Sequence, residues 1–424
     1  MYLDKEQTDI LNGSQGDTMA KIMKTLVMYG ETFEADKLIP ITSEEGHLVT
    51  SFGINVMDPY YEMFESLLQA GVKSKQSFTV DPSPMDMGNV PASPIQKLVF
   101  KILYKNQKRY DDQLKRMGIK GEDMYTCTCY MDEVGNIPDY GDILSWAESS
   151  AVVYANSVLG ARCNRNSAII EMFGSIIGYV PNFGLTTDEG RKATWIIDIN
   201  ADKLPEAQVL GSAIGLKVME DVPYIRGLDK FLGNDLTQEV KDYLKDMGAA
   251  TASNGAVGLY HVEGITPEAK KLNDALIAKD AKTYLIDEKE LLRVQESYPC
   301  IWKDPKAKPK LAFIGCPHLS LLQLKDWSNK IDAELRSRGR EKVSVPTVLT
   351  SSVPVINEFK KTEEYQILIS TGAKLSYICP LMYLSNPLCS KMPIITNSNK
   401  LRTYTTAKYY RDDQLLDILG KEIG

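Results

Sequence analysis

The chain has 424 residues, of which 43% are hydrophobic and 25% are charged, a composition typical of a globular protein with roughly two to three domains. Its 49 basic and 56 acidic residues leave a net charge of −7 without a long run of one sign, which argues against nucleic acid or an anionic membrane as a partner. The sequence shows no recognisable signal peptide and no apolar stretch long enough for a membrane span, so we expect a cytoplasmic protein.

The first quarter of the chain is predicted to be mainly helical. Apolar residues at helical spacing predict helices over 18–29, 58–70 and 95–116. Residues 38–41 predict a short strand, because the segment is apolar and Pro40 suits a strand end. Residues 81–88 are rich in Pro, Asp and Gly, and they predict a loop.

The middle of the chain contains a helix of unusual composition, predicted over 146–162. Alanine and serine are frequent in it, and its apolar positions repeat at helical spacing, so we expect it to be buried against its neighbours. Its polar residues Glu148 and Asn156, and Arg162 at its end, must then be satisfied inside the protein. They could belong either to a structural network or to a ligand site.

Two apolar segments further along the chain have ambiguous patterns. Residues 210–218 and 255–262 predict either buried strands or helices interrupted by glycine, with a turn at 221–224 between them. Residues 267–279 predict a helix that begins with a proline.

From about residue 308 the pattern alternates between strands and helices. Strands are predicted at 311–315, 343–349, 375–378 and 392–396, and helices at 319–337, 353–361 and from 404 onward. This alternation implies a mostly parallel sheet, with functional residues at the carboxyl ends of the strands. We therefore expect an α/β protein with an N-terminal lobe at 1–265 and a C-terminal lobe at 266–424.

The seven cysteines are the first candidates for chemistry. Three positions lie at or beside predicted strand ends: Cys316, Cys379, and either Cys127 or Cys129. Thiolates are the usual ligands of iron–sulfur clusters, and three ligands would leave one iron open to a substrate hydroxyl. The alternative is that all seven are reduced thiols in the core. No Cys-x-x-Cys is present, so the spacing leaves both interpretations open.

Polar residues follow the small-residue helix and the last predicted strand. Residues 160–165 include two arginines and an asparagine, which suit a carboxylate or a phosphate, or else compensate the helix dipole. Residues 396–400 could bind an anion, or Asn397 or Ser398 could simply cap a helix. His318 could orient a ligand or serve a structural role.

Several long motifs of this sequence closely resemble those of the aconitase X family, and they occur in the family's order. The longest is the block at 146–165, which contains the small-residue helix. The others lie at 30–33, 38–43, 126–128, 252–264, 315–318 and 396–398. Together they extend over nearly the whole chain, from about residue 7 to 410, so the resemblance is specific.

The resemblance implies an aconitase-superfamily core and an enzyme that eliminates water with an iron–sulfur cluster, of the 2Fe-2S or the 4Fe-4S/3Fe-4S type. The family's cluster ligands fall on Cys127, Cys316 and Cys379. The family also has a small swivelling domain that brings a serine to the site. This chain ends soon after the motif at 396–398, so we expect that domain to be a separate small subunit.

Family members resemble either cis-3-hydroxy-L-proline dehydratases or, in archaea, mevalonate 5-phosphate dehydratases. We expect the first activity, which gives 1-pyrroline-2-carboxylate, because the chain differs from the shorter archaeal large subunits. Mevalonate 5-phosphate is the alternative substrate, and a non-catalytic scaffold subunit is a second alternative.

The predicted site combines the motifs that carry the resemblance. Glu148, His318 and Ser398 are the predicted catalytic residues. Residues predicted to bind the small anionic substrate are Ser149, Ser150, Asn156, Arg162, Asn164, Arg165 and Lys400. The sequence departs from the family pattern at three places: Cys129 replaces the usual proline, Cys163 replaces a threonine, and the segment 43–47 is longer than the usual Ser-Ala-His.

Overall fold

Helix caps and apolar stripes define the N-terminal region of the computed structural model, which describes residues 1–51, 53–54 and 57–422. Asp4 opens the first helix through a capping box with Gln7. The helices of this region are α1 (Lys5–Leu11), α2 (Asp17–Thr32), α3 (Asp58–Gln69), α4 (Pro94–Leu103), α5 (Gln107–Met117) and α7 (Ala168–Ile177). Its strands form two pairs: β1 (Leu38–Pro40) is antiparallel to β4 (Tyr179–Pro181), and β2 (Gly46–Leu48) is parallel to β3 (Phe78–Val80).

The single helix predicted over 95–116 is wrong, because the chain breaks between α4 and α5. Phe100 of α4 packs in a core with residues of the C-terminal region, whereas Tyr110 of α5 packs in the N-terminal core. Tyr104 at the break donates a hydrogen bond to the Met382 carbonyl over 3.1 Å. The two halves therefore pack in different hydrophobic cores. The loop predicted at 81–88 is confirmed.

The small-residue helix is shorter than predicted, and its burial is confirmed. It forms α6 (Ser149–Tyr154) and continues as one π-helical turn, Ala155–Leu159. The Glu148 carboxylate caps its start by accepting from the Ala151 amide over 2.6 Å. Gly160, with a φ of 78°, ends it in the left-handed conformation.

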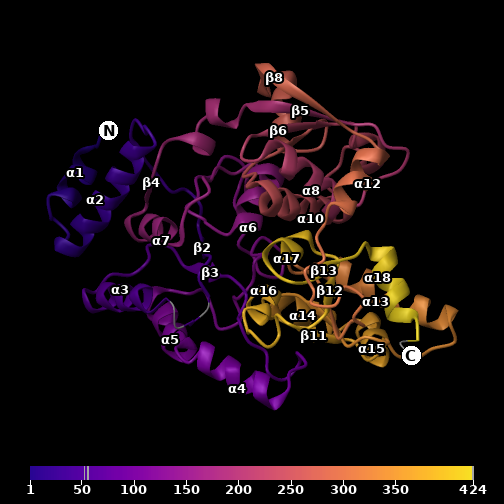
Figure 1. Cartoon of the computed structure of the whole chain (residues 1–424). Helices are drawn as coiled ribbons and strands as arrows, with labels where there is room; N and C mark the ends of the chain where they lie inside the picture. The colour runs from indigo at the N-terminus through magenta and orange to yellow at the C-terminus, as the bar shows by residue number, and fades with distance from the viewer. Residues whose placement is uncertain (52, 55–56, 423–424) are drawn as a thin grey trace.

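The middle region contains a four-stranded parallel sheet in the order β7-β6-β5-β8. Its strands are β5 (Ala193–Ile199), β6 (Pro223–Arg226), β7 (His261–Val262) and β8 (Ile277–Ile286). Its helices are α8 (Ala207–Val218), α9 (Asp229–Leu232), α10 (Gln238–Gly255), α11 (Pro267–Leu272) and α12 (Glu288–Glu296). In Figure 1 α8 and α10 lie side by side below this sheet.

The structure resolves the two ambiguous segments of this region. Residues 210–218 belong to the unbroken helix α8, and 255–262 include the end of α10 and strand β7. The helix predicted at 267–279 is too long, because Asn273 has a φ of 48° and ends α11 before β8 begins. The sequence did not predict β5, α12 or most of α10, and the turn predicted at 221–224 is too long, because β6 begins at Pro223.

The alternation predicted for the C-terminal region is confirmed by a five-stranded parallel sheet in the order β11-β10-β9-β12-β13. Its strands are β9 (Leu311–Ile314), β10 (Thr347–Thr350), β11 (Lys374–Ser376), β12 (Ile394–Thr396) and β13 (Lys408–Tyr409). Its helices are α13 (Leu321–Ser337), α14 (Val353–Phe359), α15 (Glu363–Ser370), α16 (Pro380–Leu384), α17 (Asn399–Tyr404) and α18 (Asp412–Gly420). The helix predicted from 404 onward is therefore replaced by β13 and the later helix α18.

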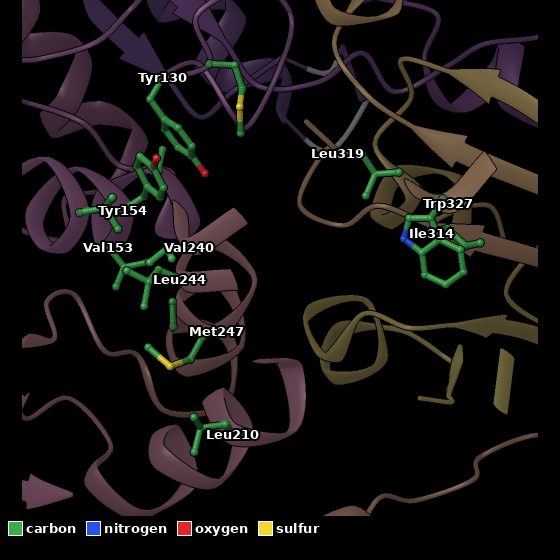
Figure 2. Packing of buried hydrophobic residues seen from close by; sticks show 14 of the residues in the cluster. Tyr130, Val153, Tyr154, Leu210, Val240, Leu244, Met247, Ile314, Leu319 and Trp327 are labelled. Atoms are coloured by element: carbon green, nitrogen blue, oxygen red, sulfur yellow. The ribbon is translucent and has the colours of Figure 1, made fainter. Parts of the chain in front are cut away.

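The largest hydrophobic core joins the middle and C-terminal regions. It includes Tyr130 and Tyr154, whose rings stack with centroids 3.7 Å apart, and Leu244 of α10 (Figure 2). Ile314 and Trp327 contribute from the C-terminal sheet and from α13. Within the described part of the chain, no helix combines the length and the apolar character that crossing a membrane requires.

Candidate active site

Three cysteines from distant parts of the chain line one small cavity where the N-terminal and C-terminal regions meet. They are Cys127, Cys316 and Cys379. Cys316 follows β9 through Gly315, which has a φ of 102° and leaves no room for a Cβ beside the Thr350 carbonyl. The remaining lining residues are Asp81, Pro82, Gly315, His318, Pro380, Leu381 and Lys400.

The structure separates Cys127 from Cys129. Cys127 lines the cavity, and its sulfur accepts a hydrogen bond from the His318 amide over 3.4 Å. Cys129 is fully buried in the hydrophobic core and does not line the cavity. Cys163 is also fully buried, and its sulfur accepts from the Trp146 amide over 3.3 Å.

The three lining thiols suit a polynuclear metal group better than a single ion. Among the residues that the structure describes, no three His, Cys, Asp or Glu side chains converge closely enough to hold one metal ion. Cysteine ligands of a cluster bind different irons, so they surround a cavity instead of converging on one point. Burial raises the pKa of Cys379 to about 12 and that of Cys127 well above its ordinary value. The nearby Lys400 ammonium opposes both shifts and could balance the charge of bound thiolates.

Lys400 and Glu148 form a buried ion pair beside this cavity. Glu148 also accepts from the Ser150 hydroxyl over 2.7 Å. Burial raises the pKa of Glu148, but Lys400 and the hydrogen bonds outweigh burial and lower it overall. Burial lowers the pKa of Lys400, but Glu148 and the nearby thiols outweigh it and raise the value well above its ordinary range. A fixed cation therefore faces the cavity, where it can hold an anionic group.

His318 and Ser398 hold the loop that carries Cys316. The His318 ring is within hydrogen-bonding distance of the Thr126 hydroxyl at Nδ1, 3.1 Å, and of the Ile378 carbonyl at Nε2, 3.2 Å. Burial lowers its pKa to about 4, so the ring is neutral and donates from Nε2. The Ser398 hydroxyl donates to the Cys316 carbonyl. Both predicted catalytic side chains thus already have partners inside the protein.

Four predicted substrate-binding residues lie away from the cysteine cavity. The side-chain oxygen of Asn156 accepts from the Cys163 amide, and Arg162 binds Asp188 over 2.5 Å. Asn164 and Arg165 line a separate open depression of about 560 Å³. Of the predicted substrate-binding residues, Lys400 lines the cysteine cavity and Ser150 lies within 3.4 Å of its ammonium. Ser149 begins α6 next to Ser150.

Two polar residues of this site, Asp81 and His47, were not predicted from the sequence. Asp81 directly follows β3 and lines the cavity, and its Oδ1 faces His47 Nε2 at 3.5 Å. Burial raises the pKa of Asp81 to about 6, although His47 opposes the shift. Because β3 has only three residues, its strand end left no periodic signal in the sequence.

Comparison with protein families gives matches along most of the chain. The family model described as aconitase X first domain matches residues 1–189, the second domain 193–296 and the third domain 309–417. A solved structure titled as the holo-form of aconitase X from Thermococcus kodakaraensis matches with a TM-score of 0.79 and 30% identity, covering 100% of both chains.

Curated relatives carry two names. The phosphomevalonate dehydratase large subunit of Thermococcus kodakarensis is 34% identical over 83% of this chain and 81% of its own length. That of Methanosarcina mazei is 30% identical over 95% of this chain and 92% of its own length. The cis-3-hydroxy-L-proline dehydratase of Pseudomonas aeruginosa is 28% identical over 70% of this chain, which spans 49% of that relative.

Proposed function

This chain belongs to the aconitase X family and is a dehydratase subunit, and from that premise we propose that it is the large subunit of a phosphomevalonate dehydratase. The relatives of that name are more similar to this chain than the hydroxyproline dehydratases, and their lengths are closer to its own. The hydroxyproline substrate that the sequence led us to expect therefore has weaker support. The observation that carries the chemistry is the cavity that three cysteines and Lys400 line together.

The residues around the cavity have different roles in the proposed dehydration. Cys127, Cys316 and Cys379 would hold an iron–sulfur cluster, which supplies a Lewis acid for the departing hydroxyl. The Lys400 ammonium binds an anionic group of the substrate, and Glu148 fixes that ammonium in place.

Other groups complete the proposed site. His318 and Ser398 keep the shape of the loop at 315–318 through their hydrogen bonds. We assign the base that removes the proton next to the carboxylate to a separate small subunit. This chain alone should then bind substrate without turning it over.

Reconstitution tests this proposal directly. The chain is purified anaerobically with its cognate small subunit, and iron and acid-labile sulfide are measured first. Mevalonate 5-phosphate and cis-3-hydroxy-L-proline are then assayed separately, with each subunit alone as the control. We expect turnover of mevalonate 5-phosphate by the pair only. Turnover of hydroxyproline instead would overturn the substrate assignment, and an iron-free preparation would favour a scaffold role.

A further inference from the structure

One carboxylate that lines the cavity, that of Asp81, has no role in the sequence motifs or in the proposed function. Asp81 lies between β3 and the loop at 81–88, and its side chain keeps 18% of its exposure where it lines the cavity. Its Oδ1 is buried, and the structure gives it no hydrogen-bond partner among the described residues. His47 Nε2 lies 3.5 Å from this oxygen and is likewise buried. The Cys129 thiol also interacts with the His47 ring.

His47 is held from behind in one orientation. Its Nδ1 lies 2.8 Å from the Thr79 hydroxyl, and its ring meets Trp146 edge-on with centroids 5.7 Å apart. The Thr79 oxygen accepts from the Asn136 amide over 3.0 Å and donates its own proton to the Gly46 carbonyl over 3.5 Å, so His47 Nδ1 is the donor to Thr79. Burial lowers the pKa of His47, but the Cys129 thiol and Asp81 outweigh burial and raise the value well above its ordinary range. The ring therefore carries a hydrogen on both nitrogens, and the one on Nε2 points toward Asp81.

The other titratable groups around the cavity are committed to different partners. Glu148 is bound by Lys400, Ser150 and the Ala151 amide, and it does not line the cavity. Both ring nitrogens of His318 have partners inside the protein. Among the described residues that line the cavity, Asp81 is therefore the carboxyl group that is available to a substrate.

Dehydration of mevalonate 5-phosphate needs a proton on the leaving oxygen. The hydroxyl lies β to the carboxylate, so the C–H electron pair next to the carboxylate becomes the double bond and the C–O electron pair leaves on oxygen. We propose that Asp81 is the catalytic acid that protonates this oxygen, and that the His47 imidazolium is the positioning residue that holds Asp81 and replaces its proton from Nε2, which leaves a neutral ring. After water and product leave, solvent returns the proton to the pair through Asp81, because His47 itself is fully buried. This inference rests on the proposed dehydratase function.

A substrate analogue with a fluoride leaving group distinguishes a residue that protonates the leaving group from one that acts at an earlier step, because fluoride departs without being protonated. The test compares mevalonate 5-phosphate with its analogue in which fluorine replaces the leaving hydroxyl, using the two-subunit enzyme. For Asp81→Asn we expect the kcat for water loss to fall about a hundredfold or more. Fluoride release should stay within about fivefold of wild type. Iron content and the substrate Kd, measured by equilibrium dialysis, should not change.

Two further variants make the test robust. His47→Gln retains a nitrogen donor and should lower the kcat for water loss about tenfold, with KM unchanged and fluoride release preserved. It also carries the test if Asp81→Asn fails to fold. Asp86→Asn is the matched control, because Asp86 lies in the same loop but is bound by Asn89 and by Ser376 at 2.8 Å. Its ratio of water loss to fluoride release should equal that of wild type.

The outcomes are distinct. Equal losses with both compounds in Asp81→Asn or His47→Gln would overturn the acid role, because the residue would then act before the C–O bond breaks. Unchanged water loss in both variants would overturn it as well. A wild-type enzyme that acts on neither compound would overturn the proposed function, and this inference with it.

Discussion

Charge balance in the cavity depends on single residues, and Lys400 is the most consequential of them. Its ammonium is buried, and it neutralises Glu148, which is buried as well. Lys400→Met would leave that carboxylate without a partner, so we expect the free energy of unfolding to fall by about 3–5 kcal/mol. Adding Glu148→Gln should recover part of the loss. Denaturant titration of both variants measures this, and equal stability of the two would contradict the pairing.

The cysteines give a second prediction at the scale of residues. Serine is a harder and less acidic ligand than cysteine, so Cys127→Ser, Cys316→Ser and Cys379→Ser should each lose the cluster and turnover. Cys129→Ser should retain iron, because Cys129 lies in the core and does not line the cavity. Iron and acid-labile sulfide in anaerobic preparations provide the measurement.

Cys300→Ser and Cys389→Ser serve as controls for the cysteine series, since neither residue lines the cavity. They should keep iron near the wild-type level. Loss of iron from Cys129→Ser but not from Cys127→Ser would show that the ligand assignment is displaced by two residues. Retention of iron in every variant would reject the cluster.

At the scale of elements, α8 and α10 show why glycine matters in a buried helix. Gly211 lies where an added Cβ would be 2.2 Å from the Met247 carbonyl oxygen of α10. Gly211→Ala should therefore force the helices apart and reduce the free energy of unfolding by about 1–3 kcal/mol. Leu216→Ala on the exposed side of α8 is the matched control and should change stability little. Thermal unfolding of both variants tests this contact.

The start of α8 gives a prediction about pH. Burial raises the pKa of Glu206 to about 8, the Asp412 carboxylate adds to the rise, and the hydrogen bond from Tyr409 opposes it. The folded value exceeds the ordinary value of 4.5, so this group's stabilisation is full below about pH 4.5 and is lost as the pH rises to 8. Glu206→Gln should remove this loss of stability, which is on the order of 5 kcal/mol for a pKa raised from 4.5 to about 8. Unfolding curves of both proteins between pH 5 and pH 9 should diverge toward high pH, and parallel curves would contradict the shift.

At the scale of the whole molecule, the proposed cluster would connect regions that are far apart in the sequence. Cys127 precedes α6, whereas Cys316 and Cys379 follow strands of the C-terminal sheet. Because a group that binds only the folded state stabilises it, iron removal should lower the Tm by about 3–10 °C. Hydrogen exchange should speed up at 126–128 and 315–318 but not in β5 and β6. A uniform change across the chain would contradict this bridging role.

Local patterns were sufficient to predict much of this molecule. The alternation after residue 308 predicted the parallel sheet, because each strand and helix there carries its own apolar periodicity. The motif at 146–165 indicated the family, which the family models confirm. The positions of Cys316 and Cys379 after strands drew attention to one edge of the sheet, and the structure places both at one cavity.

Tertiary packing alone decided the rest, because it depends on contacts between residues distant in the sequence. At the break between α4 and α5, apolar residues of one segment pack into two separate cores. Glu148 meets Lys400 across 252 positions, and no local pattern encodes that pair. The same packing directs Arg162 and Arg165 away from the cysteine cavity and brings Asp81 into it. The sequence by itself therefore determined the family and the candidate ligands, whereas the fold determined which polar groups face the cavity, since burial and pairing are properties of the assembled chain.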